Sequence, residues 1–146
     1  MMKRVYDYLE IDDFERIVNA LIAIRETFSE DIPAFHTRYA GKLEGIIAQV
    51  QANYFGKEQY PNLHSKAAFL FYALIKNHPF FNGNKRVAVV ALFEFLKRNA
   101  LEVYLDEQTL LNDLFELAIY TSESSAEDFK KVMNRLKRKI KIMILD

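Results

Sequence analysis

The sequence predicts an all-α protein, built as one compact helical bundle over residues 1–146. Apolar residues recur mostly at spacings of three and four, which is the period of an amphipathic helix. Only 4 glycines and 3 prolines interrupt the chain, and these residue types are the usual helix breakers. About half of the residues are apolar, which is enough for one hydrophobic core and too little for two comfortable domains.

The first two helices are expected before residue 52. Asp12 is predicted to cap the first helix while Glu15 reaches back to the cap, in the capping-box pattern. The inner stripe of this helix consists of Phe14, Ile17, Leu21 and Phe28. Pro33 closes the segment, and a second helix is predicted over about 37–51. Its apolar side carries Tyr39, Leu43, Ile46, Ile47 and Val50.

A loop and two buried helices are expected next. Residues 52–62 lose the helical pattern and contain Gly56 and Pro61, so they predict a loop, a short extended flap able to move over a site. Residues 64–77, HSKAAFLFYALIKN, are apolar on nearly every face. Such a helix is stable only when others surround it. A similar helix is predicted over 84–99, which forces the connection between the two toward the core.

The C-terminal part predicts a short extended piece and two more helices. Leu101 and Val103 begin a brief alternation after Asn99. A helix capped near Asp106 is expected to run to about Tyr120. A capping box of Ser124 and Glu127 is predicted to start the last helix. The apolar stripe of that helix consists of Phe129, Val132, Met133, Leu136, Ile140 and Met143.

Composition limits the function classes. The 20 basic and 20 acidic residues cancel, so no global field attracts nucleic acid or an anionic membrane. The seven cations of the last helix are interpreted as a solvated face, and no direct nucleic-acid partner is expected. The absence of cysteine excludes disulfides and thiolate chemistry. No apolar run is long enough for a signal peptide or a membrane span, so a cytoplasmic protein is expected.

The chemistry is concentrated in residues 78–86, HPFFNGNKR, between the two buried helices. Gly83 can adopt backbone angles closed to other residues. The amides of residues 83–85 are expected to be free donors at the start of the following helix, and such an end binds phosphate. Lys85 and Arg86 add full positive charges close to the same anion.

His78 lies just ahead of this expected anion site. A neutral imidazole can accept the proton of an attacking hydroxyl, so the segment predicts group transfer from a nucleotide. Asn82 is a candidate Mg²⁺ ligand through its amide oxygen, although a neutral oxygen holds a hard cation less firmly than a carboxylate does. Phe80 is expected to point inward and hold the loop. His36 and His64 have no comparable neighbours and are assigned no function.

The segment HPFFNGNKR resembles the Fic/Doc family signature, H-x-F-x-(acidic or Asn)-(Gly or Ala)-N-(Gly or Lys)-R, and every fixed position is matched. The resemblance covers about residues 35–135 and implies the family's helical fold. It also implies that His78 is the general base for a protein hydroxyl. By the same resemblance, Asn84 and Arg86 hold phosphates, and Gly83 lines the anion site.

Three positions bear on the branch of the family. Lys85 stands where adenylyl-transferring Fic enzymes usually have Gly, and this resembles the death-on-curing (Doc) branch, in which the nucleotide is understood to present its γ-phosphate. Val89 stands where many Fic enzymes carry a second arginine, which also favours the Doc branch. Asn82 replaces a common acidic metal ligand. The chain lacks the family's Ser/Thr-x-x-x-Glu-(Gly/Asn) inhibitory motif, which implies restraint by a separate antitoxin protein.

The resemblance therefore predicts a Doc-like toxin of a toxin–antitoxin system. Such an enzyme transfers a phosphoryl group from ATP or another nucleoside triphosphate, with Mg²⁺, to a Ser or Thr hydroxyl of a protein, by resemblance a translation factor. One alternative is nucleotidyl transfer (AMPylation) to the same kind of hydroxyl. Another is a non-catalytic module that binds a nucleotide or a partner. The aromatic residues of the expected flap either hold an extended segment of substrate or antitoxin or pack the loop down; they are Tyr54, Phe55 and Tyr60.

Overall fold

The computed structural model describes residues 4–24, 32–104 and 106–146, and the all-α prediction is confirmed. The helices within these ranges are α1 (Ile11–Ala23), α2 (Lys42–Val50), α3 (Leu63–Lys76), α4 (Asn84–Asn99), α5 (Glu107–Glu123) and α6 (Phe129–Met143). Short 3-10 turns are η2 (Phe35–Thr37) and η3 (Ala126–Asp128). The strands have two residues each: β1 (Asn53–Tyr54), β2 (Lys57–Glu58), β3 (Glu102–Val103) and β4 (Ile144–Leu145).

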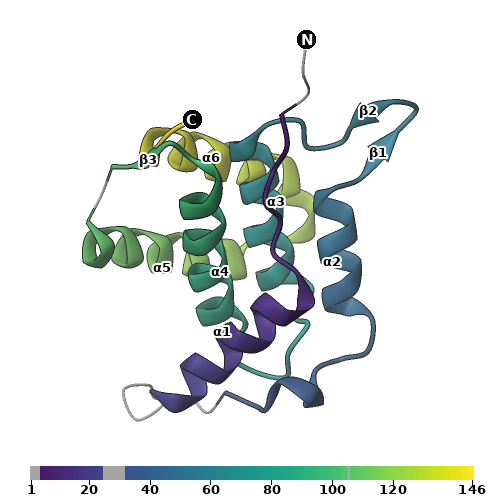
Figure 1. Cartoon of the computed structure of the whole chain (residues 1–146), viewed down its shortest axis with the longest axis vertical. Coiled ribbons are helices and arrows are strands. Elements are labelled where there is room, and N and C mark those ends of the chain that lie inside the picture. The colour runs from purple at the N-terminus through teal and green to yellow at the C-terminus, as the bar shows by residue number, and fades with distance from the viewer. Residues whose placement is uncertain (1–3, 25–31, 105) are drawn as a thin grey trace.

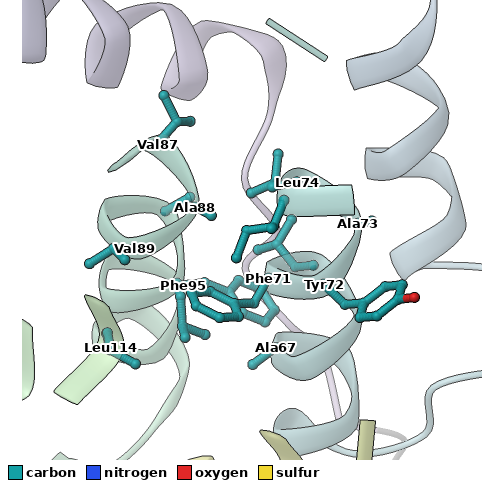
Figure 2. Close-up of a cluster of buried hydrophobic side chains, with 14 of the residues drawn as sticks. Ala67, Phe71, Tyr72, Ala73, Leu74, Val87, Ala88, Val89, Phe95 and Leu114 are labelled. Carbon is teal, nitrogen blue, oxygen red and sulfur yellow. The ribbon is translucent and has the colours of Figure 1, made fainter. Parts of the chain in front are cut away.

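Helix α3 is the centre of the bundle, as its apolar sequence predicts. It packs against α2, α4, α5 and α6, and Figure 1 shows it standing between α2 and α4. Phe71 of α3 and Phe95 of α4 are almost fully buried and belong to the apolar cluster drawn in Figure 2. The residues that join α3 to α4 are consequently held between the ends of two buried helices.

Helix α1 begins earlier than the sequence predicts. Its N-cap is Glu10, not Asp12, and the capping box closes through Asp13, whose carboxylate accepts a hydrogen bond from the Glu10 backbone amide at 2.8 Å. The same carboxylate binds Arg98 of α4 at 2.7 Å. This tertiary ion pair holds Asp13 in the position that the sequence prediction gave to Glu15, and nothing in the local sequence reveals it. Phe14, Ile17 and Leu21 are buried as predicted; Phe28 lies outside the described residues.

Helix α2 is shorter than the predicted 37–51, because the preceding backbone is bound elsewhere. The amide of Tyr39 donates to the carbonyl of Pro79 at 3.0 Å. Arg38 is extended, and Gly41 takes a left-handed φ of 80° at the N-cap. Residues 38–41 therefore connect to the segment after α3 instead of continuing a helix.

The predicted flap forms a β-hairpin, but it does not cover the predicted site. Strands β1 and β2 pair antiparallel around Phe55 and Gly56, both at positive φ, as a tight two-residue turn requires. The hairpin precedes the first turn of α3, and His78 follows its last turn. The 14 residues of α3 separate the two by about 21 Å, and Figure 1 shows the hairpin at the far end of α3. Of its aromatic residues, Tyr60 packs on Phe69, whereas Phe55 is fully exposed.

The C-terminal elements follow the prediction except at the start of α6. Strand β3 pairs with β4, and Asp106 caps α5 by accepting from the Thr109 amide at 2.9 Å. The capping box predicted at Ser124 is absent, because the Ser124 hydroxyl donates back to the carbonyl of Thr121 at 2.6 Å. The turn η3 intervenes, and α6 begins at Phe129. Among the described residues, no helix combines the length and the apolar character that crossing a membrane requires.

Candidate active site

His78 lies at the point where α3 ends, in an unusual backbone conformation. Asn77 is the C-cap of α3 and donates to the carbonyl of Ala73 at 2.9 Å. His78 follows with a positive φ of 48°, at a position where helices usually place glycine. A left-handed residue with a side chain costs about 1–3 kcal/mol. His78 is exposed, so burial does not compensate this cost, and the imidazole points to a function.

Asn84 holds the loop that carries His78. Its Oδ1 accepts a hydrogen bond from the amide of Phe80 at 3.0 Å, and its Nδ2 donates to the carbonyl of Phe80 at 2.9 Å. The same Nδ2 lies 3.4 Å from Nδ1 of His78. Phe80 is 3% exposed and contacts Phe35 with ring centroids 6.2 Å apart, so its side chain lies in the core. The Asn84 side chain thus supports the loop, which leaves its backbone amide for a ligand.

Gly83 shapes the start of α4. It is the N-cap with φ 80° and offers no side chain to the first-turn amides. A Cβ at this position would lie 3.1 Å from Cγ1 of Ile32, so a larger residue would require the Ile32 side chain to shift. The first-turn N–H groups of a helix lack intrahelical acceptors, and the helix dipole favours an anion in front of them. With no capping side chain in the way, this end of α4 is suited to phosphate.

A pocket of about 390 Å³ lies in front of this helix end. The motif residues that line it are His78, Phe81, Asn82, Gly83, Asn84, Lys85 and Arg86. Lys85 is exposed, and the Arg86 guanidinium lies 5.7 Å from the Phe115 ring centroid. Among the described residues, no carboxylate lines the pocket, so its electrostatic potential is set by the two cations and the helix dipole.

Helix α5 forms the opposite wall of the pocket with Phe115, Ile119 and Ser122. Sequence reasoning missed these residues. They lie about thirty positions after the motif and belong to a helix with no distinguishing pattern. Only the packing of α5 on α4 brings them to the pocket. Phe115 offers a flat aromatic ring and Ile119 an aliphatic side chain. Such apolar contacts suit the base or ribose of a nucleotide better than its phosphates.

A second group of residues supports His78 from the side of α2. Lys42 donates through Nζ to the carbonyl of Asn77 at 3.1 Å and lies 4.5 Å from the Tyr39 ring centroid. The Tyr39 ring contacts the ring of Phe81 at 4.4 Å. Residues 38–41, which the sequence predicts to be helical, therefore contact the loop that carries His78.

Two positions bear on the branch of the family. Val89 is fully buried, and in Figure 2 it lies on the side of α4 away from α3, where Leu114 of α5 packs. Position 89 is therefore occupied by a small apolar side chain within the core. Asn82 is exposed at the rim of the pocket. No cluster of three or more His, Cys, Asp or Glu suited to a metal occurs among the residues that the structure describes.

Comparison with known proteins identifies the family. The model of the Fic/DOC family matches residues 8–96. The chain belongs to the Fic/DOC family. The match includes α1, although the resemblance in sequence was placed over residues 35–135 only. The match ends within α4, so α5 and α6 lie beyond it. Members of this family are generally transferases.

One curated relative is similar over part of this Fic/DOC chain. It is named Toxin Doc, comes from Mycolicibacterium smegmatis and is 39% identical over 66 residues. The aligned region is 45% of this chain and 51% of the relative, so the chain spans about half the length of the curated relative that it matches. No solved structure matches this chain.

Proposed function

We propose that this chain is a Doc-like toxin that transfers a phosphoryl group from a nucleoside triphosphate to a Ser or Thr hydroxyl of a protein. The observation that carries the proposal is one pocket in which His78 faces an uncapped helix start beside Lys85 and Arg86. Family membership and the relative named Toxin Doc support it. A translation factor as target, a separate antitoxin and a cytoplasmic location belong to the same proposal.

In this mechanism the start of α4 binds the phosphates. Its first-turn amides, Lys85 and Arg86 stabilise the charge that spreads over the transferred group, which is the main task in phosphoryl transfer. The apolar residues of α5 hold the rest of the nucleotide. The pocket thereby fixes one phosphorus atom in front of His78.

His78 removes the proton of the attacking hydroxyl. The free ring nitrogen for this step is Nε2, which requires the proton of the neutral ring on Nδ1. The contact of Nδ1 with the side-chain nitrogen of Asn84 is long, 3.4 Å, so it does not enforce the opposite tautomer. The imidazole lines the pocket.

Magnesium fits this site only as an ion that arrives with the nucleotide. From the described residues, the pocket offers the Asn82 amide oxygen and no carboxylate, whereas protein sites for Mg²⁺ usually supply one or two carboxylates beside the phosphates. When bound, Mg²⁺ neutralises charge on the phosphate oxygens. Asn82 would then contribute one neutral ligand, and Lys85 and Arg86 carry most of the remaining charge compensation.

Nucleotidyl transfer is the alternative reaction on the same residues. The two reactions differ in whether the α- or the γ-phosphate faces His78, and Lys85 favours the γ-phosphate by resemblance to the Doc branch. Val89 supports the same choice, because this chain lacks the second arginine that many Fic enzymes carry at that position.

The deciding experiment is label transfer in a bacterial lysate with magnesium ATP labelled at either the α- or the γ-phosphate. We expect protein labelling from the γ-phosphate alone, and its loss in His78→Ala. His64→Ala is the matched control, because His64 lies in the first turn of α3, at the other end from the pocket, and it should label like the wild type.

Each other outcome has a defined meaning. Labelling from the α-phosphate would replace phosphoryl by nucleotidyl transfer. No label from ATP, GTP, CTP or UTP, combined with retained nucleotide binding, would establish a non-catalytic module. Labelling that persists in His78→Ala would remove the general base from the mechanism.

A further inference from the structure

The outer face of α6 concentrates the positive charge of the molecule. Its 15 residues contain seven of the chain's 20 lysines and arginines and no acidic residue. This leaves 13 cations against 20 acids in the rest of the chain. The net charge of zero therefore conceals a strongly basic helix on an acidic remainder.

Five of these cations line one groove, which we call the α6 groove. Its volume is about 890 Å³, and it is lined by His64, Glu127, Asp128, Lys130, Lys131, Asn134, Lys137, Arg138 and Lys141. The α6 residues follow one helical stripe from 130 to 141, about 16 Å long. Every lining residue is polar, and the acidic pair lies at the N-terminal end of the stripe.

The groove cations have no ion-pair partner among the described residues. Within those ranges, none of the ion pairs includes a lysine or arginine of α6. The positive potential also reaches α3: burial, then Lys141 and Lys137, hold the pKa of His64 below its usual value. The groove thus presents uncompensated positive charge to its surroundings.

Helix stability does not explain this arrangement. The helix dipole favours cations in the last turn, where Lys141 is the only one. Lys130 and Lys131 lie in the first turn, where the dipole disfavours them. Lys137 and Lys141 are four residues apart, a spacing at which like charges repel. A purely structural helix would gain by having acids at some of these positions.

We propose that the α6 groove binds the phosphodiester backbone of a nucleic acid. A stripe of lysines and arginines with one amide, Asn134, provides the usual donors to backbone phosphates. A protein partner would typically need aromatic or apolar anchors, and no described residue of that kind lines the groove. Glu127 and Asp128 repel phosphate, so the nucleic-acid backbone is expected over the stretch of the groove from Asn134 to Lys141. The sequence expectation of no nucleic-acid partner rested on the zero net charge and on the usual role of such a charge run as a solvated, dipole-favoured helix face.

The test is fluorescence anisotropy of the full chain with a labelled single-stranded RNA, a DNA duplex and polyglutamate, each over a salt series. We expect nucleic-acid binding that weakens with salt. The double variant Lys137→Gln/Lys141→Gln should lose about tenfold in affinity or more, and its salt slope should fall by about two. The measurement involves no transferase activity, so its result is independent of the proposed function.

The matched control is Arg135→Gln/Lys139→Gln. It removes the same charge at the same spacing from the same helix, but these residues line a different pocket beside Asp113 and Glu116. It should stay within about twofold of the wild type. The proposal would be overturned if both double variants lost affinity equally, or if the chain bound no nucleic acid. Tighter binding of polyglutamate would also overturn it, and would assign the groove to an acidic protein.

Discussion

His78 and Asn84 show how the site depends on two residues with different tasks. His78 follows α3 in a conformation that glycine would adopt more easily. A histidine at this position therefore lowers the stability of the fold. Asn84 is expected to hold phosphate by resemblance to the family. Its side-chain amide binds both backbone groups of Phe80, so Asn84 also supports the loop that carries His78.

Asn84→Ala should therefore destabilise the protein as well as inactivate it. The variant leaves the N–H and C=O of Phe80 without their partners in a buried loop, which costs about 2 kcal/mol. Asn112→Ala, on the exposed face of α5, should stay within about 0.5 kcal/mol. Urea unfolding of both variants measures the difference; a stable but inactive Asn84→Ala would mean that its amide serves the ligand alone.

At the scale of elements, glycines decide where two helices begin. Gly41 and Gly83 both precede a helix with φ 80°. Gly45 lies inside α2, and a methyl group added to its Cα would meet nothing within 4 Å. The same residue type is thus required at two helix starts and unfavourable within a helix, because its freedom helps only where φ is positive.

Replacement of these glycines by alanine should change stability with opposite signs. Gly41→Ala adds backbone strain and should cost about 1 kcal/mol. Gly83→Ala should cost more, because its Cβ also meets Ile32 at 3.1 Å. Gly45→Ala should stabilise by up to about 1 kcal/mol through helix propensity. Thermal unfolding of the three variants measures these differences in stability. If Gly45→Ala were destabilising, helix propensity would not control stability at this exposed position of α2.

At the scale of the molecule, one ion-pair network joins α1 to α4. Asp13 binds Arg98 at 2.7 Å, and Arg16 binds Glu94 at 2.5 Å. The hydrogen bond from Arg98 is the main cause that lowers the pKa of Asp13 below its usual 3.8. The network fixes α1 across the helix whose first turn lines the pocket.

This network predicts a loss of stability in acid. A carboxyl whose pKa is lower in the folded state contributes fully above its unfolded pKa, and the contribution disappears as pH falls through the folded value. Wild type should therefore lose stability below about pH 4. Asp13→Asn should be less stable than wild type at neutral pH and approach it in acid. Urea unfolding over this pH range is the measurement, and parallel profiles would exclude a role of Asp13 in the acid transition.

The sequence by itself determined the helical class, the bounds of α4 and the residues of the motif. Helical periodicity is local, and Gly83, Lys85 and Arg86 are neighbours in the chain. The tertiary structure decided the rest. Glu10 and Asp13 replaced Asp12 and Glu15 in the first capping box, because Arg98 lies opposite Asp13. Residues 38–41 are not helical, because the backbone amide of Tyr39 donates to the carbonyl of Pro79. Helix α5 supplied the second wall of the pocket, because contacts between distant residues depend on packing that no local pattern records.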